Sequence, residues 1–172
     1  MIARRRFLGL ALGLPATLTG CGWEPLYADH ETEPASADLR AIQVAPINER
    51  IGQRLEMGLR NSLNPTNEST PKLYLLKVTL VVSFADTGIT SEGLGTRGTV
   101  QGSASYNLTD IKTNKVVQTS SLHAYESFDI QANGYSTVVA QDDASTRIAE
   151  ELRREIVTRL TLYMQKKDMP AS

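Results

Sequence analysis

The clearest pattern in the chain is an alternation of apolar and other residues between positions 74 and 84. A period of two places every second side chain on the same face of a β-strand. The other face begins with Leu73 and Leu75 and becomes polar toward Ser83. The pattern predicts a strand of about twelve residues, roughly twice the usual length, with one face in the core. The alternating apolar positions are Tyr74, Leu76, Val78, Leu80, Val82 and Phe84.

Two further strands are predicted after this one, from Thr96 to Thr109 and from Lys115 to about Phe128. A Gly-rich loop, Asp86 to Gly95, precedes the first of them, and Asp110 to Asn114 forms a turn between the two. Two successive antiparallel hairpins make a meander, and here one face of it is polar and rich in Ser and Thr. On the strand from Thr96, one face is predicted to carry Gly98, Val100, Gly102, Ala104, Tyr106 and Leu108. One side of the last strand is predicted to carry Val117, Thr119, Ser121, His123 and Tyr125.

Helical spacing occurs in two segments. Leucine or isoleucine recurs every four residues between Ile51 and Leu63, with Asn48 as a fair N-cap and Asn64-Pro65 as the end of the helix. A second and longer helix is predicted from about Ser136 to Met164. Its opposite surface alternates Arg and Glu, which is typical of a solvated, salt-bridged face. The apolar stripe of this helix comprises Ala144, Ile148, Leu152, Ile156, Leu160 and Tyr163.

A short strand at Ile42 to Val44, stopped by Pro46, completes the order β-α-β-β-β-α. The simplest way to bury these apolar faces is a two-layer α+β fold. It would have a four-stranded, mostly antiparallel sheet with two helices packed on one face. We expect one domain spanning residues 39–172.

The N-terminus has the features of a secretory signal. Arg4, Arg5 and Arg6 precede an apolar run from Phe7 to Leu14, which is shorter than the roughly 18–20 residues needed to span a bilayer. Shortly after it comes Leu18-Thr19-Gly20-Cys21, which resembles the lipobox of bacterial lipoproteins. This resemblance implies cleavage between Gly20 and Cys21, a diacylglyceryl group on the Cys21 sulfur and a further acyl group, such as palmitate, on the new amino terminus.

Two alternatives remain open for this segment. The first is an ordinary signal peptide in which Cys21, the chain's only cysteine, is incidental. The second concerns the export route, because Arg4-Arg5-Arg6-Phe7-Leu8 resembles a twin-arginine signal while an ordinary Sec signal also carries arginines. In the lipoprotein interpretation, several acyl chains would hold the protein firmly to a membrane, since one chain alone binds only marginally.

The net charge of the chain bears on which functions are excluded. Removal of residues 1–20 would leave a net charge of −4, because that segment holds three of the 18 basic residues and none of the 19 acidic ones. A mildly acidic domain argues against general nucleic-acid binding. Residues 21–38 are predicted to be a lipidated tether, apolar at Trp23 and Tyr27 and then acidic with Pro and Ser. The apolar first part either lies at the membrane–water boundary, which Trp and Tyr favour, or packs on the domain as a strand edge.

The chain offers little chemistry for catalysis, so we expect no active site, no metal site and no cofactor. Its two histidines, His30 in the tether and His123 on a strand, have no paired spacing for a metal. Gly93-Leu94-Gly95 lacks the Lys-Ser/Thr of a phosphate loop and is better explained as a hairpin. The notable feature is instead the small, hydroxyl-rich strand from Thr96, which is either an ordinary solvent-facing strand or a surface that lies close to another backbone or a sugar-rich ligand.

Two motifs suggest a family. Cys21 to Tyr27, Cys-Gly-Trp-Glu-Pro-Leu-Tyr, resembles the start of lipopolysaccharide-assembly lipoproteins of the LptE type. Tyr135 to Ala140, followed by Ala149 to Ile156, is also similar to that family. The resemblance covers nearly the whole chain, but it is specific only at the two ends, and the middle matches in pattern alone.

The resemblance implies a non-catalytic role in the outer membrane. Members of the family plug a large outer-membrane β-barrel, assist its assembly and help to deliver lipopolysaccharide to the outer leaflet. The expected location is the periplasmic side of the outer membrane, reached through the lipid anchor, and Gly22 after the cysteine fits the family's sorting requirement. The expected partners are this barrel and, as a second candidate, lipopolysaccharide itself. A polar barrel interior would suit the polar sheet face, so Thr99, Gln101 and Ser103 are the candidate partner-binding residues.

Two other interpretations stay open. One is a periplasm-facing lipoprotein whose sheet binds a small ligand or a peptide. The other is a lipoprotein enzyme with an unrecognised site. Arg97 and Lys115 lie on or beside the predicted sheet, but no motif assigns them to a lipid ligand.

Overall fold

A computed structural model of the chain describes residues 34–89 and 95–168. The described residues all lie within one compact unit. The signal peptide, Gly20, Cys21 and most of the predicted tether lie outside the described residues, so those assignments stay predictions, and so does the domain boundary at residue 39.

The structure contains three helices and four strands within this part of the chain. Their order is α1 (Pro34–Arg40), β1 (Ile42–Val44), α2 (Arg50–Leu63), β2 (Tyr74–Ile89), β3 (Gly95–Asp110), β4 (Lys115–Asp129) and α3 (Gly134–Asp168). The predicted order is confirmed, with α1 as an addition. Residues 34–38 had been assigned to the tether, but they form most of this short helix, which packs against α3.

The four strands form one sheet in the order β1-β2-β3-β4. β1 runs parallel to β2, while the β2–β3 and β3–β4 pairs are antiparallel. The predicted α+β class and the mostly antiparallel sheet are therefore confirmed. The register places Leu80 opposite Ala104, which in turn lies opposite Leu122.

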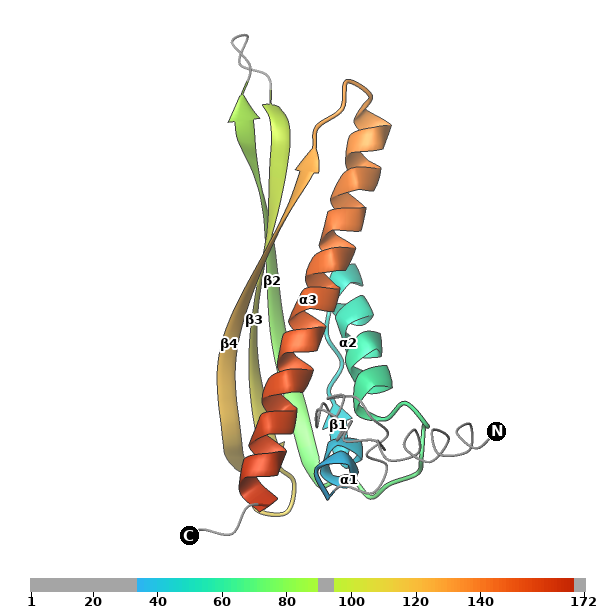
Figure 1. Cartoon of the computed structure of the whole chain (residues 1–172), viewed down its shortest axis with the longest axis vertical. Helices are drawn as coiled ribbons and strands as arrows, with labels where there is room; N and C mark the ends of the chain where they lie inside the picture. Colours follow the sequence, from blue (N-terminus) through green and yellow to red (C-terminus); the bar gives the residue numbers. More distant parts are fainter. Residues whose placement is uncertain (1–33, 90–94, 169–172) are drawn as a thin grey trace, which may run out of the picture. The chain divides into compact units, whose positions relative to one another are not determined.

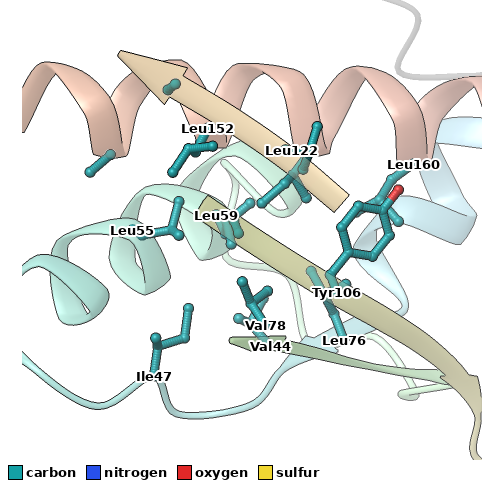
Figure 2. Packing of buried hydrophobic residues seen from close by; sticks show 14 of the residues in the cluster. Val44, Ile47, Leu55, Leu59, Leu76, Val78, Tyr106, Leu122, Leu152 and Leu160 are labelled. Atoms are coloured by element: carbon teal, nitrogen blue, oxygen red, sulfur yellow. The ribbon is translucent and has the colours of Figure 1, made fainter. Parts of the chain in front are cut away.

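The helices cover one face of this sheet (Figure 1). α3 packs against β3 and β4, and it also contacts α2 and α1. The alternating apolar face of β2 points into the layer between sheet and helices, as predicted, although Leu80 and Val82 are only partly buried and Phe84 is exposed. Figure 2 shows side chains from both layers meeting in this core. Residues that define it are Val44, Leu55, Leu59, Leu76, Val78, Tyr106, Leu122, Leu152, Ile156 and Leu160.

The element ends differ from the sequence prediction in three places. β2 continues through Asp86 to Ile89 and β3 begins at Gly95, so part of the predicted Gly-rich loop is strand. α3 extends to Asp168, and its buried stripe ends on Met164, with Tyr163 only partly buried beside it. Asn48 is not the N-cap of α2. The cap is Glu49, which has a positive φ of 71° and makes no side-chain capping bond.

Polar contacts join α2 to α3 on the side away from the sheet. Arg54 Nη2 donates to Asp142 Oδ2 at 3.0 Å, and Arg54 also donates to the Thr146 hydroxyl. This hydrogen bond lowers the pKa of the Asp142 carboxyl. The predicted salt-bridged surface of α3 is also present, for example between Arg159 and Glu155 at 2.7 Å.

Small residues on β3 let α3 approach the sheet closely. An added Cβ at Gly102 would lie 2.4 Å from Ile148 Cγ2, and one at Gly98 would lie 2.2 Å from Phe128 Cζ. Both glycines therefore face the core of this protein. Their size is explained by α3 and by the Phe128 ring, so they carry no information about a ligand or an outside partner.

We expect Gly102→Ala to lower the free energy of unfolding by about 1–3 kcal/mol, the usual cost of overpacking. The matched control is Gly134→Ala at the start of α3, where an added Cβ would meet nothing within 4 Å. This control should change stability by less than about 0.5 kcal/mol. Urea unfolding of both variants measures the difference, and equal stabilities would show that α3 does not press on Gly102.

Candidate functional site

The outer face of the sheet, the one turned away from the helices, is the candidate contact surface. On β3 it carries the odd-numbered residues, which alternate with buried residues from Gly98 to Leu108, and on β4 it carries the exposed odd-numbered residues from Thr119 to Ser127. We call this surface the open face. Three rows of facing residues form its centre: Thr79–Ser105–Ser121, Val81–Ser103–His123 and Ser83–Gln101–Tyr125.

The predicted binding residues Thr99, Gln101 and Ser103 lie together on this face, along the central strand β3. Each is half-buried between its neighbours. Their common position was predictable from alternation alone. Their part in binding a partner is not tested by this placement and stays a prediction.

Hydrogen bonds connect β3 to β4 across the open face. Ser103 Oγ lies 3.0 Å from His123 Nδ1, and Gln101 Nε2 donates to the Tyr125 hydroxyl at 3.3 Å. Two pairs beyond Ser103–His123 on the same face, the Thr119 hydroxyl donates to Asn107 Oδ1 at 2.9 Å. These bonds orient polar side chains of β3 and β4 toward one another on the open face, which suits a preorganised contact.

Three residues of this surface were not among the predicted site residues. They are Tyr125, which is 63% exposed, Val81, which is 61% exposed, and His123, which faces Ser103 in the same row as Val81. Alternation placed His123 and Tyr125 on one side of β4 but could not say which residues of β3 they face. That information depends on the cross-strand register, which the sequence pattern does not contain.

The open face has features of a contact surface. The Ser103–His123 pair stands on an exposed strand face, where nothing excludes water from a reacting group. Within residues 34–89 and 95–168, no group of three His, Cys, Asp or Glu side chains could hold a metal ion. In the same ranges, no helix has the length and apolar character needed to cross a bilayer. The expected absence of an active site, a metal and a cofactor stays a prediction.

Charged groups lie at the margins of the open face. Arg97 and Asp129 form an ion pair of 3.8 Å near the ends of β3 and β4, with both side chains largely exposed. Lys115 begins β4, opposite Asp110. On the inner face, by contrast, burial raises the pKa of the Tyr106 hydroxyl, which keeps it neutral. The three central rows of the open face contain no Asp, Glu, Lys or Arg, and exposed Lys77 faces Asn107 one row beyond them.

The fold is similar to that of several solved lipoproteins. A candidate lipoprotein from Caulobacter crescentus CB15 has a TM-score of 0.61 at 21% identity, over 76% of this chain and 96% of that chain. A minor lipoprotein from Acinetobacter baumannii has a TM-score of 0.48 at 14% identity, over 71% and 89%. Rare lipoprotein B from Shewanella oneidensis has a TM-score of 0.49 at 8% identity, over 74% and 95%. The likeness to the Caulobacter protein establishes a shared fold and nothing more.

The family is established by sequence. No curated protein matches the chain significantly. Residues 39–160, however, match the family LptE, described as lipopolysaccharide-assembly. The matched segment begins near the end of α1 and ends within α3, so it includes every strand of the sheet. The chain therefore belongs to the LptE family of lipopolysaccharide-assembly proteins.

Proposed function

We propose that this chain is an outer-membrane lipoprotein that plugs the lipopolysaccharide-export β-barrel, helps to assemble it and thereby aids delivery of lipopolysaccharide to the outer leaflet. Membership of the LptE family supports the general role in lipopolysaccharide assembly. The observation that supports plugging is the open face itself, a mainly polar surface that runs along β2, β3 and β4 on the side of the sheet away from the helices.

The chemistry of the two surfaces is compatible. A barrel of the outer membrane is apolar toward lipid and polar toward its lumen. A plug must therefore present hydrogen-bonding groups and avoid large apolar patches where it meets the wall. The open face offers hydroxyl and amide groups, for example on Ser105, Ser121 and Asn107. The ion pair of Arg97 with Asp129 lies at one margin of this face.

The anchor in this proposal is Cys21. Acylation there would tether the domain to the inner leaflet of the outer membrane, while residues 22–33 would separate the lipid from α1. Direct contact with lipopolysaccharide is a further part of the proposal for which no residue is assigned.

A second candidate function is a periplasm-facing binding module for a small ligand or a peptide. Exposed Tyr125 and Val81 favour it, since an aromatic ring surrounded by hydrogen-bonding groups can also serve as a ligand platform. Purification in detergent separates the two functions. A plug should elute bound to one very large barrel protein, whereas a binding module should elute alone.

The contact face can be tested with Ser103→Trp. The side chain lies on the open face and is half-exposed, so the domain should stay folded, as circular dichroism would show. Recovery of the barrel on the tagged protein should fall, because overpacking a close-packed contact costs about 1–3 kcal/mol. The matched control is Ser69→Trp in the exposed loop before β2, which should recover as much barrel as the unchanged protein. Equal recovery by both variants would exclude the centre of the open face from the contact.

A further inference from the structure

We infer that the barrel partner also pairs with the free edge of β4, where an extended segment of its backbone adds one more strand to the sheet. This inference rests on the proposed function, because it describes how the same partner binds. The open face provides side-chain contacts, whereas this edge provides backbone hydrogen bonds. We call the five residues concerned the β4 edge: Thr119, Ser121, His123, Tyr125 and Ser127.

The direction of the backbone groups on β4 follows from its pairing with β3. One residue past the end of β4, the Ile130 N–H donates to Thr96 O at 3.1 Å, so an even-numbered residue points its N–H toward β3. The register between the two strands has no shift from Gln118 to Asp129. Because backbone groups alternate in direction along a strand, the N–H and C=O groups of the β4 edge point away from β3.

Two arginines of α3 confirm this direction and leave the edge open. Arg159 lies 3.5 Å from Ser121 O, and Arg147 lies 3.5 Å from Ser127 O. Both contacts are at the long limit of a hydrogen bond. Each guanidinium also bonds a glutamate at a shorter distance, 2.7 Å for Arg159 and 3.0 Å for Arg147. Since a carbonyl oxygen has two lone pairs, both carbonyls can also accept a bond from a partner N–H.

Accessibility distinguishes the β4 edge from the opposite edge of the sheet. All five of its residues are exposed, and Tyr125 is 63% exposed. On β1, by contrast, Ile42 and Val44 are only 4% and 3% exposed. β4 is the last strand in the sheet order (Figure 1), and in the part of the chain that the structure describes no strand pairs with its outer side. A partner can therefore reach the backbone of β4, whereas that of β1 is covered.

Continuity with the open face assigns the β4 edge to the barrel. The same residues that point their backbone outward carry their side chains on the open face, where His123 and Tyr125 bond to Ser103 and Gln101. A strand added to β4 would thus extend the open face by one more row of side chains. A partner that covers this face meets the edge at the same time.

The chemistry of the β4 edge defines the segment that fits it. None of its five residues is Asp, Glu, Lys, Arg or Pro. An extended segment rich in Ser, Thr or Asn and free of proline matches these neighbours across the strands. The wall strands of a closed barrel are already paired on both sides, so the segment belongs to a loop or a terminus of the barrel chain that enters the lumen.

The first test compares Ser121→Pro with Ser121→Ala in the full tagged chain, with recovery of the barrel from detergent-solubilised outer membranes as the measurement. Both variants lose the hydroxyl group, but only proline loses the outward N–H. Proline is tolerated on an edge strand, where this N–H is not part of the ladder, and circular dichroism checks the fold. We expect Ser121→Pro to recover roughly two- to tenfold less barrel than Ser121→Ala, the loss of one or more hydrogen bonds.

Hydrogen exchange of the unchanged chain is the second test and needs no variant. Residue-resolved mass spectrometry compares the free chain with the barrel complex. The N–H groups of His123 and Tyr125 should exchange at least roughly tenfold more slowly in the complex. The matched control is the Phe84 N–H, on the exposed end of β2 at the opposite edge, which should exchange equally in both samples.

Equal recovery by the two folded Ser121 variants, or unchanged exchange at His123 and Tyr125, would overturn this inference alone and leave the plug function in place. Slow exchange of these groups in the chain without the barrel would also overturn it, because it would assign the edge to a second copy or to the chain's own N-terminal segment. Failure of the unchanged chain to recover any barrel would overturn the proposed function, and this inference with it.

Discussion

Replacing Cys21 with alanine should abolish lipid attachment and leave the protein uncleaved or soluble. The expected effect is large, because the sulfur of Cys21 is the only thiol in the chain and no other residue can take the diacylglyceryl group. Each methylene of a buried acyl chain contributes about 0.8 kcal/mol to membrane binding, so loss of two or three chains removes the anchor entirely. Mass spectrometry of the mature N-terminus measures the result directly.

The control for this variant is Gly22→Ala, which keeps the thiol and should still be acylated. Membrane fractionation alone is a weaker readout, since a barrel partner could retain the unlipidated protein in the membrane fraction. Detection of acyl groups on the Cys21→Ala protein, or of an unmodified Cys21 in the unchanged one, would contradict the lipoprotein assignment.

Truncating Leu152 to alanine should destabilise the domain by about 2–5 kcal/mol, as for other fully buried leucines. Leu152 is completely buried at the centre of the α3 stripe (Figure 2), and its Cδ1 lies only 3.3 Å from where a Cβ on Gly102 would be. Because α3 packs so closely on β3, the surrounding side chains can collapse only partly into the space left by the leucine. The measurement is urea unfolding in the Cys21→Ala background, which avoids detergent.

Leu162→Ala is the matched control on the same helix, since Leu162 is 60% exposed. It should cost less than about 0.5 kcal/mol. If both truncations cost the same, or if Leu152→Ala costs less than about 0.5 kcal/mol, the packing of α3 on the sheet is wrong.

Local patterns were sufficient for the features that depend on near neighbours in the chain. The alternation from Tyr74 to Phe84 predicted a strand with one apolar face, and the four-residue spacing from Ala144 to Leu160 predicted the buried stripe of α3. Both are confirmed, because side-chain direction in a strand or helix follows directly from the backbone period. The prediction of lipidation at Cys21 also rests on a few adjacent residues, but Cys21 lies outside the described residues and its lipidation stays a prediction.

Features that depend on distant segments needed the tertiary structure. The small residues of β3 left open whether this strand faces solvent or lies close to another backbone or a sugar-rich ligand, and only the approach of α3 and of Phe128 shows what lies beside Gly102 and Gly98. Asn48 is a better N-cap by residue type than Glu49, yet Glu49 takes that position. Just before it in the chain, the Ile47 N–H donates to the side chain of Glu56, a residue of α2. Propensity is a weak preference, and a long-range contact can exceed it.

The sequence by itself determined which residues of β3 share the open face, because Thr99, Gln101 and Ser103 are two positions apart. Only the tertiary structure decided that Ser103 faces His123 and Gln101 faces Tyr125, and that β1 lies at the edge beside α2. Register and strand order are properties of pairs of segments that lie far apart in the chain. They are set by how the whole core packs together, and a pattern within one segment carries no record of its partner.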